Sequence, residues 1–141
     1  MYGGDNVQCI MKTEEGILIY QHGEKKILKK GLKQYLNELL LKEYSTYEGR
    51  IHAIKKRHKM YRNVPIFINH EYCFYTIHSL RHHQAVCINY HAVLSIRATD
   101  QNTTEIIFKN LQIIHLTVPY AYVLRKHMRT GWFIEQYTKE H

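Results

Sequence analysis

With 141 residues, of which 45% are hydrophobic and 23% charged, the chain has the size and composition of one globular domain, which excludes a largely disordered protein. Lysine and arginine number 20 against 12 aspartate and glutamate residues, and the net charge of +8 favours an anionic partner. No stretch approaches the roughly 18 apolar residues of a membrane span, and no secretion signal opens the chain, so we expect a cytoplasmic protein with no membrane partner.

The N-terminal part predicts a β-hairpin followed by a helix. Apolar runs at 7–11 and 17–21 flank the sequence TEEG, in which Gly16 supplies the turn, and a third strand is possible at 26–28. From 31 to 44, leucine and tyrosine side chains recur at intervals of three and four residues. This spacing is typical of an amphipathic helix, which we expect to cover the strand pair.

The next segment, STYEGRIHAIKKRHKMYR, predicts a basic helix from about 46 to 58. Ser45 and Glu48 stand three residues apart, as in a capping box at a helix N-terminus. Two isoleucines give this helix only a narrow apolar stripe. It therefore docks by one edge and presents its cations to solvent or to a ligand.

After Pro65 the sequence becomes rich in isoleucine, valine, phenylalanine and tyrosine, and turn-forming residues separate the apolar runs. The predicted strands are 66–69, 72–77, 85–90, 93–98, 105–109 and 112–116. Short strands without helices between them indicate an antiparallel sheet or two packed sheets.

Pro119 starts a predicted C-terminal helix. Its buried stripe is predicted at Val123, Leu124 and Met128. Its solvent side is predicted at Arg125, Lys126 and Arg129. We expect Trp132 and Phe133 to close the core.

Together these elements predict an α+β fold, an antiparallel β-rich single domain over residues 1–141. It has an N-terminal hairpin-helix annex at 1–44, the basic helix at 45–62, and the sheet with the C-terminal helix at 63–141. The first part holds seven basic and six acidic side chains, and the third part holds seven basic and five acidic ones. The middle part holds six basic side chains and only one acidic one. The excess of positive charge is therefore concentrated in the middle part.

The strongest candidate site is this basic cluster. It comprises Arg50, Lys55, Lys56, Arg57, Lys59 and Arg62, with His52 and His58 interleaved. Each lysine or arginine that reaches a phosphate displaces a counterion, so the cluster can bind a nucleic-acid backbone whatever the base sequence. The alternative is a solvated helix face without a ligand.

A second candidate is the sequence HSLRHHQ, residues 78–84, between two predicted strands. Its DNA-binding candidates are Arg81, His82, His83 and Gln84. Arginine and glutamine can reach base edges with two hydrogen bonds, and histidine can donate to a phosphate or a base. The alternative is an exposed polar turn.

Cysteine and histidine usage predicts no metal and no other cofactor. The three cysteines, Cys9, Cys73 and Cys87, are widely spaced and lie in apolar runs, which favours buried free thiols over a disulfide framework. Although there are 11 histidines, the sequence contains no HExxH and no pair of cysteines two residues apart.

Motifs for enzymatic catalysis are also missing. Neither GxSxG nor GxxxxGK[ST] occurs, and the carboxylates are scattered. We therefore expect no enzyme. A small metal-independent nuclease stays an alternative, because it needs only a histidine pair and a cationic or tyrosine side chain.

Several stretches of the chain resemble the ComK competence transcription factors of Gram-positive bacteria. The similarity runs from about residue 45 to residue 133 and begins with an S-x-Y-x-G-R element. The matching positions are Ser45, Tyr47, Gly49, Arg50, Pro65, Ile66, Phe74, Thr76 and Arg81. The sequence departs from the family pattern at Tyr75, where the family has proline, at Cys87, near its tryptophan, and at Leu111, where it has glycine.

The C-terminal half is also similar to a LytTR DNA-binding domain. The positions at matching spacing are Arg81, His83, Gln84, Ile88, Asn89, Val93 and Ile96. This similarity adds Asn89 to the candidate DNA-binding residues. It leaves a LytTR-type regulator as an alternative within the same functional class.

The resemblance to ComK implies a sequence-specific transcriptional activator of genes for DNA uptake. Such a protein would bind double-stranded DNA at AT-rich promoter boxes as a homodimer or larger homo-oligomer, and a proteolytic adaptor is a possible further partner. A narrow AT-rich minor groove attracts arginine and lysine through its negative potential. The basic cluster would grip the DNA, and residues 81–84 would read or position it.

Overall fold

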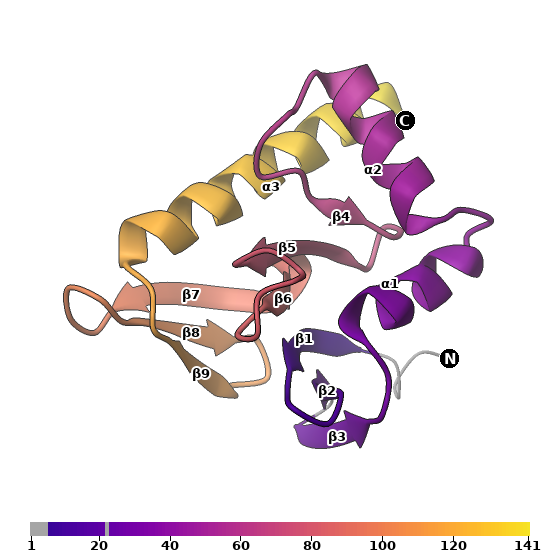
Figure 1. Cartoon of the computed structure of the whole chain (residues 1–141). Helices are drawn as coiled ribbons and strands as arrows, with labels where there is room; N and C mark the ends of the chain where they lie inside the picture. The colour runs from indigo at the N-terminus through magenta and orange to yellow at the C-terminus, as the bar shows by residue number, and fades with distance from the viewer. Residues whose placement is uncertain (1–5, 22) are drawn as a thin grey trace.

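The computed structural model describes residues 6–21 and 23–141. The elements follow in the order β1, β2, β3, α1, α2, β4, β5, β6, η2, β7, β8, β9 and α3 (Figure 1). The predicted α+β class, with antiparallel sheets and a C-terminal helix, is confirmed. Over the described residues, no helix has both the length and the apolar character that a membrane crossing requires.

The predicted N-terminal hairpin is present. It consists of β1 (Val7–Lys12) and β2 (Ile17–Gln21), and β3 (Glu24–Leu28) pairs with β2. Gly16, in the turn between β1 and β2, has a φ of 154°. A side chain at Gly16 would collide with the carbonyl of Leu28, so only glycine allows the chain to approach this closely.

One six-stranded antiparallel sheet connects this hairpin with the strands that follow α2. Its strand order is β3-β2-β1-β6-β5-β4, where β4 is Ile66–Phe67, β5 is Cys73–Ile77 and β6 is Val86–Asn89. Cys9 of β1 is paired with Ile88 of β6. Because β1 lies inside the sheet, the hairpin and the later strands depend on each other for backbone hydrogen bonds.

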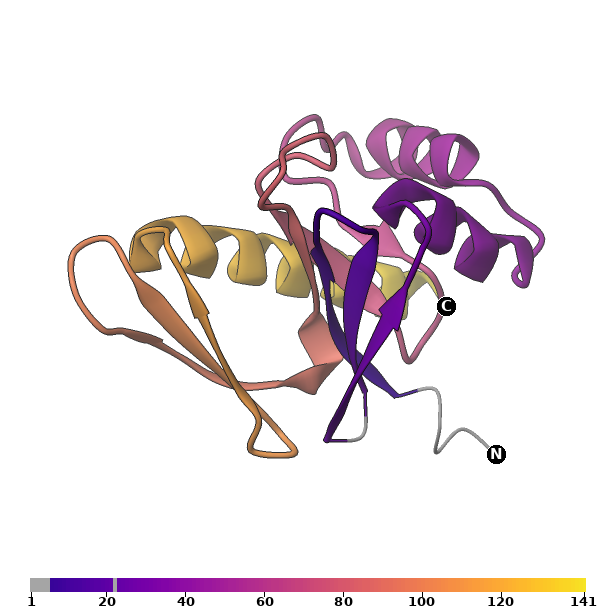
Figure 2. The ribbon, with the colours of Figure 1, turned by 60° about the horizontal axis from the view of Figure 1, so that its bottom comes forward.

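The 3-10 turn η2 (Tyr90–Ala92) leads from β6 into a second antiparallel sheet. Its order is β7-β8-β9, with β7 at Val93–Ala98, β8 at Thr104–Phe108 and β9 at Ile113–Leu116. Helix α3 (Tyr120–Glu140) runs past both sheets and packs against β5 and β7 (Figures 1 and 2). All six strands predicted for the C-terminal part are therefore present.

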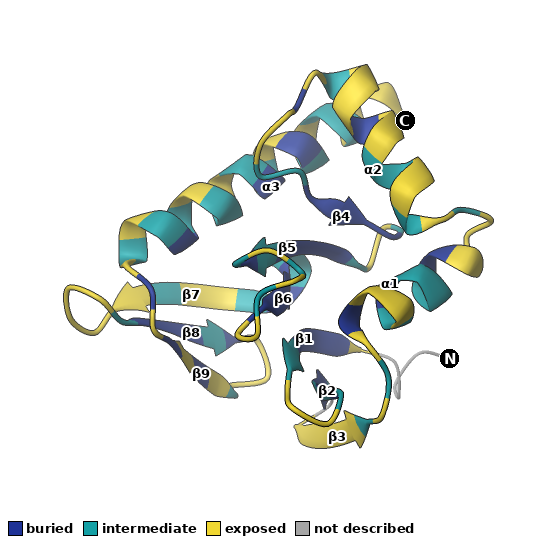
Figure 3. Cartoon of the chain, viewed as in Figure 1, coloured by how far each residue is buried: buried dark blue, intermediate teal, exposed yellow. Residues whose placement is uncertain are grey.

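The central strands of the six-stranded sheet are buried on both faces, whereas the edge strand β3 is exposed. On one face, Ile10 and Cys87 pack with Leu36 and Leu40 of α1 (Leu32–Leu41). On the other face, side chains of β1, β5 and β6 pack with the second sheet and α3. Because successive side chains of a strand point to opposite faces, β6 is buried along its whole length (Figure 3).

A third apolar cluster attaches α2 (Tyr47–His58) to the rest of the molecule. Ile54 of α2 packs with Met60, Phe67 and Phe133. The predicted basic helix and its narrow apolar contact are therefore confirmed. Phe133 closes the core as expected, and it is only 1% exposed.

The start of α2 corrects one predicted detail. Thr46 is the N-cap, and its hydroxyl oxygen accepts a hydrogen bond from the N–H of Gly49 at 3.0 Å. Ser45 lies one residue before the cap, and its N–H donates to a carbonyl in the last turn of α1, so it is not free for the reciprocal bond of a capping box. Glu48 forms an ion pair with Lys33 of α1 instead of completing a capping box.

The rotation of α3 also differs from the prediction. Val123 is buried, but Met128 is 64% exposed and Trp132 is 40% exposed. Thr130 and Phe133 continue the buried stripe. Thr130 can be buried because its hydroxyl donates a hydrogen bond to the backbone carbonyl one helical turn earlier. The pattern of hydrophobic residues alone does not predict that this polar residue belongs to the buried stripe.

The three cysteines are free and buried, as predicted. Burial raises the pKa of Cys87 to about 12 and raises the pKa values of Cys9 and Cys73 above their ordinary value. The thiols are therefore protonated and shielded, and they belong to the core.

Candidate nucleic-acid interface

Much of α2 is exposed to solvent (Figure 3). Its exposed residues include several cations. Lys55, Lys56 and Arg57 lie in the last turn of the helix, and Lys59 is its C-cap. Cations at this end are favourable locally, because the last carbonyls of a helix carry a partial negative charge. In the described part of the chain, no carboxylate forms an ion pair with Lys55, Lys56 or Lys59, so these three charges are available to a ligand.

Two other members of the predicted cluster are held by the protein itself. The guanidinium of Arg50 donates from Nη1 to the carbonyls of Phe67 at 2.9 Å and Ile68 at 3.2 Å, and it lies over the Phe67 ring. Nε of Arg57 donates to the carboxylate of Glu140 at 3.3 Å. Arg50 thus ties α2 to β4, and it is not the free cation that we expected.

The segment after α2 turns the chain back toward the sheet. Lys59 and Asn63 both have left-handed backbone conformations, with φ values of 54° and 53°. Between them, Met60 is fully buried, whereas Arg62 is exposed. The buried methionine anchors the segment, so Lys59 and Arg62 are presented to solvent from a fixed position.

The second candidate, which we call the histidine loop (residues 78–84), connects β5 to β6. Arg81, His83 and Gln84 are exposed, and His82 is half-buried. Nδ1 of His82 accepts a hydrogen bond from the N–H of Gln84 at 3.0 Å. The neutral His82 ring therefore carries its proton on Nε2.

Ring stacking orders the histidine loop. The ring centroids of His78 and His82 lie 4.1 Å apart, and those of His82 and His83 lie 4.7 Å apart. The ammonium of Lys12 donates to the carbonyl of Leu80 at 2.9 Å and fastens the loop to β1. Over residues 6–21 and 23–141, no group of three or more histidine, cysteine or carboxylate side chains is arranged to hold a metal ion.

A pocket of about 280 Å³ joins the histidine loop to the segment after α2. Its lining residues are Asn63, Val64, Tyr75, Thr76, His78, Ser79, Tyr122 and Lys126. Figure 2 shows the two segments side by side. The structure thus places Asn63, the neighbour of Arg62, close to His78 and Ser79 of the histidine loop. It adds Lys126 of α3, which sequence reasoning left outside the site.

Positive charge dominates the surroundings of His78. Desolvation lowers the pKa of His78, and so do the charges of His82, Lys126 and His83. Among residues 6–21 and 23–141, no carboxylate lines the pocket. The site therefore favours an anion over a cation.

A second cleft, of about 230 Å³, lies on the side of the histidine loop that faces β1 and β9. Its polar lining includes Lys12, His83, Gln84 and His115, and it too is lined by no carboxylate. His78 lines both clefts. The cationic character of the loop thus extends to its other side.

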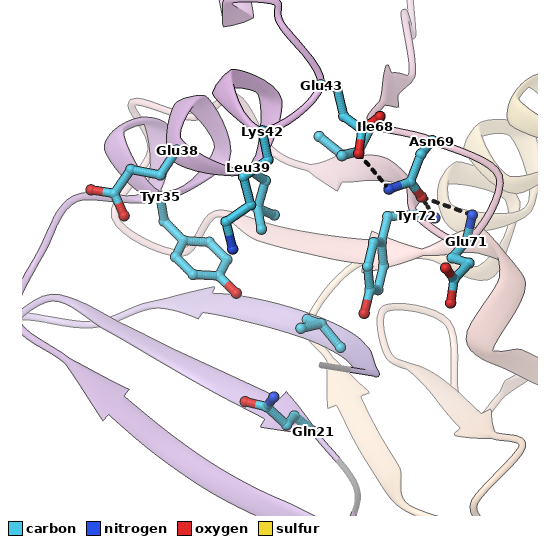
Figure 4. Close-up of a pocket in the computed structure, with 11 residues that line it drawn as sticks. Gln21, Tyr35, Glu38, Leu39, Lys42, Glu43, Ile68, Asn69, Glu71 and Tyr72 are labelled. Carbon is cyan, nitrogen blue, oxygen red and sulfur yellow. Dashed lines mark hydrogen bonds between the residues drawn. The ribbon is translucent and has the colours of Figure 1, made fainter. Parts of the chain in front are cut away.

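A third pocket has the opposite electrostatics. It measures about 250 Å³ and lies between α1, the hairpin and the turn that joins β4 to β5 (Figure 4). Of the described residues that line it, Glu38, Glu43 and Glu71 are acidic and only Lys42 is a lysine or arginine. Three carboxylates disfavour a phosphate at this position, so we leave this pocket out of the candidate interface.

A comparison with protein-family models matches residues 6–141 to the family described as ComK protein. The chain belongs to the ComK family. The comparisons with curated proteins and with solved structures gave no match. ComK proteins are competence-related transcription factors, so the chain falls in the class that its sequence motifs indicated.

The ComK match is longer than the resemblance seen in the motifs, which began at about residue 45. It includes the N-terminal strands. In this chain β1 pairs with β6, so its six-stranded sheet is incomplete without the hairpin. The motifs missed this part because its strands show only an ordinary apolar pattern.

Two departures from the ComK pattern are in the core. Tyr75 is 3% exposed, and its hydroxyl lies 3.0 Å from Nδ1 of His127 on α3. Cys87 is fully buried against α1. The third departure, Leu111, has a φ of 73° in an exposed turn, a conformation that favours the glycine of the family pattern.

The DNA contact predicted for Asn89 is wrong in this ComK protein, because the side chain is 1% exposed. Its Oδ1 accepts hydrogen bonds from the N–H groups of Cys73 and His91, and its Nδ2 donates to the carbonyls of Val7 and Glu71. Asn89 therefore joins the ends of β1, β5 and β6. The LytTR-like spacing therefore picked out a residue that holds the strands together.

Proposed function

We propose that this chain is a transcriptional activator of DNA-uptake genes that binds AT-rich double-stranded DNA through one cationic surface. We define the cationic surface as Lys55, Lys56, Arg57, Lys59, Arg62, Arg81, His82, His83 and Gln84. The observation that carries the proposal is the carboxylate-free pocket that links the segment after α2 to the histidine loop. Membership in a family of transcription factors supports the same partner.

The charge arrangement suits a duplex for two reasons. The free cations of α2 and Arg62 can neutralise backbone phosphates, which contributes affinity for any sequence. A preference for AT-rich boxes would come from their narrow minor groove, whose negative potential attracts arginine and lysine, and from their deformability. The histidine loop, with exposed Arg81 and Gln84, would position the protein or read base edges.

The test measures binding of fluorescent AT-rich and GC-rich duplexes by anisotropy, between about 50 and 200 mM salt. The double variant Lys55→Glu, Lys56→Glu should lose at least about tenfold in affinity and lower the salt slope by about two units. Its matched control is Lys25→Glu, Lys26→Glu, which changes the same charge on exposed β3. Equal losses in both variants would show a general effect of net charge and would contradict the proposed surface.

The alternatives predict other results. A LytTR-type regulator would lose base specificity in the His83→Ala and Gln84→Ala variants, and a minor-groove ligand would not compete with it. A metal-independent nuclease would cleave RNA or DNA, and the His82→Ala and His83→Ala variants would abolish cleavage. The homo-oligomer and the proteolytic adaptor implied by the family stay predictions.

A further inference from the structure

The pocket between the segment after α2 and the histidine loop has unusual backbone at its rim. Asn63 and His78 both line it, and both are non-glycine residues in the left-handed region, with φ values of 53° and 66°. The strained conformation of His78 is held by a hydrogen bond from its N–H to the hydroxyl of Tyr122 on α3, at 3.1 Å. Such conformations cost energy, and they persist where the surrounding structure fixes them.

Three polar side chains that line this pocket have no hydrogen-bond partner among the described residues. Within the described part of the chain, the side chains of Asn63, Thr76 and Ser79 form no hydrogen bond with another residue. Lys126 lies over the Tyr122 ring, with its Nζ 5.3 Å from the ring centroid, and forms no ion pair with any described residue. The pocket therefore offers an ammonium, an imidazole, an amide and two hydroxyls to a ligand.

We propose that this pocket is a binding site for one phosphoryl group, held by Lys126 and His78 and by the side chains of Asn63, Thr76 and Ser79. All five can donate hydrogen bonds, and none of the described residues that line the pocket is a carboxylate that would repel an anion. The volume of about 280 Å³ leaves room for a phosphate and its bound waters.

The position of the pocket indicates what the phosphate would do. Asn63 follows Arg62 in the chain, and Ser79 precedes Arg81 by two residues. A phosphate bound between them would bridge the two parts of the cationic surface and fix their register on a duplex. This role rests on the proposed function, whereas binding of a phosphoryl group by itself does not.

The first experiment uses inorganic phosphate alone, titrated into the full-length, isotopically labelled protein and followed by NMR. We expect saturable shifts at His78 and its neighbours, and the pKa of His78 should rise because a bound dianion favours the charged ring. Lys126→Gln should weaken phosphate binding about tenfold or more, since it removes a charge-assisted hydrogen bond. Arg125→Gln, the same change of charge one residue earlier on α3, should leave the affinity unchanged.

A second variant distinguishes loss of the phosphate site from misfolding, in case Lys126→Gln disturbs the fold. Ser79 is exposed at the rim, so Ser79→Asp should leave the thermal unfolding midpoint close to that of the parent and still repel phosphate. Absence of saturable shifts in the parent protein, or equal affinities in Lys126→Gln and Arg125→Gln, would overturn the phosphate site.

The source of the phosphoryl group is settled by competition with duplex DNA. If the ligand is the DNA backbone, phosphate should compete with DNA, and Lys126→Gln should lower the salt slope of DNA binding by about one unit. If the ligand is a free phosphate ester, a mononucleotide should saturate the pocket and leave the DNA affinity unchanged. Saturable phosphate binding by a protein that binds no duplex would refute the proposed function and keep the site.

Discussion

The guanidinium of Arg57, in the last turn of α2, lies 3.3 Å from the carboxylate of Glu140, the last residue of α3. Nε2 of His58 lies 4.0 Å from the same carboxylate oxygen. The end of α3 thereby places a negative charge against the cationic surface. A DNA phosphate that approaches Arg57 must replace or repel this carboxylate.

We therefore predict that Glu140→Gln raises the affinity for DNA. Removing the carboxylate frees Arg57 for one more phosphate contact, so the salt slope should increase by up to about one unit. Anisotropy titrations at several salt concentrations measure both quantities. The control is Glu135→Gln, because Glu135 pairs with Lys139 on α3 and does not touch α2.

The two glutamate variants lose the same charge, which separates a local effect from a general one. An equal gain in affinity for Glu140→Gln and Glu135→Gln would mean that Arg57 does not contact the duplex. Exposed ion pairs contribute little to folding, so the stability of both variants should stay within about 1 kcal/mol of the parent.

Asn89→Ala should destabilise the fold by about 2–4 kcal/mol, because it leaves the buried N–H of Cys73, the part-buried N–H of His91 and two carbonyls without their side-chain partner. Urea unfolding followed by circular dichroism measures the change. As a control, Asn110→Ala removes an exposed turn residue and should cost less than about 1 kcal/mol. If the Asn89→Ala variant kept the stability of the parent but lost DNA binding, Asn89 would be a DNA contact, as the sequence predicted.

Leu111→Gly should stabilise the protein by up to about 1 kcal/mol. The left-handed conformation at Leu111 is unfavourable for a residue with a Cβ atom, and the leucine side chain is 71% exposed, so little burial is lost. Ile113→Gly, in nearby β9, is the control and should lower stability, since the backbone there is extended. Thermal and urea unfolding of both variants would decide, and a loss of stability in Leu111→Gly would show that the side chain packs in solution.

Stability should fall in mild acid because of His127. Burial lowers the pKa of His127, whose ring stacks on Tyr90 with centroids 4.4 Å apart. The unfolded chain therefore takes up this proton at a higher pH than the folded chain. The stability that the neutral His127 ring contributes is fully present at a pH above the unfolded-state pKa of about 6.5. This contribution is lost as the pH falls from there through the lower pKa of the folded state.

Urea unfolding between about pH 7.5 and pH 5 tests this linkage. His127→Phe keeps an aromatic ring next to Tyr90 and removes the titration, so its stability should change less with pH than that of the parent. Identical pH dependence in the two proteins would assign the acid sensitivity to other groups, such as half-buried His91, whose pKa burial also lowers.

The local sequence determined the secondary structure and the concentration of positive charge on α2. The hairpin was predictable because Gly16 and the flanking apolar runs act over a few residues, and the strands of the C-terminal part were predictable from their composition. The free cations Lys55 and Lys56 could be placed on a solvent-facing helix because the apolar stripe of that helix is so narrow. Short motifs were enough to indicate the ComK family.

Only the tertiary structure decided which of these residues share a site. Asn63, His78 and Lys126 come from three parts of the chain and meet because α3 packs across β5, a contact that no local pattern encodes. Other tertiary contacts take Arg50 and Asn89 out of the interface: Arg50 donates to a carbonyl of β4, and Asn89 donates to a carbonyl of β1. Buried backbone groups without partners of their own must be satisfied by a side chain. Hydrophobic periodicity tells which residues prefer burial, but the partners of a polar side chain depend on which segments come together in space.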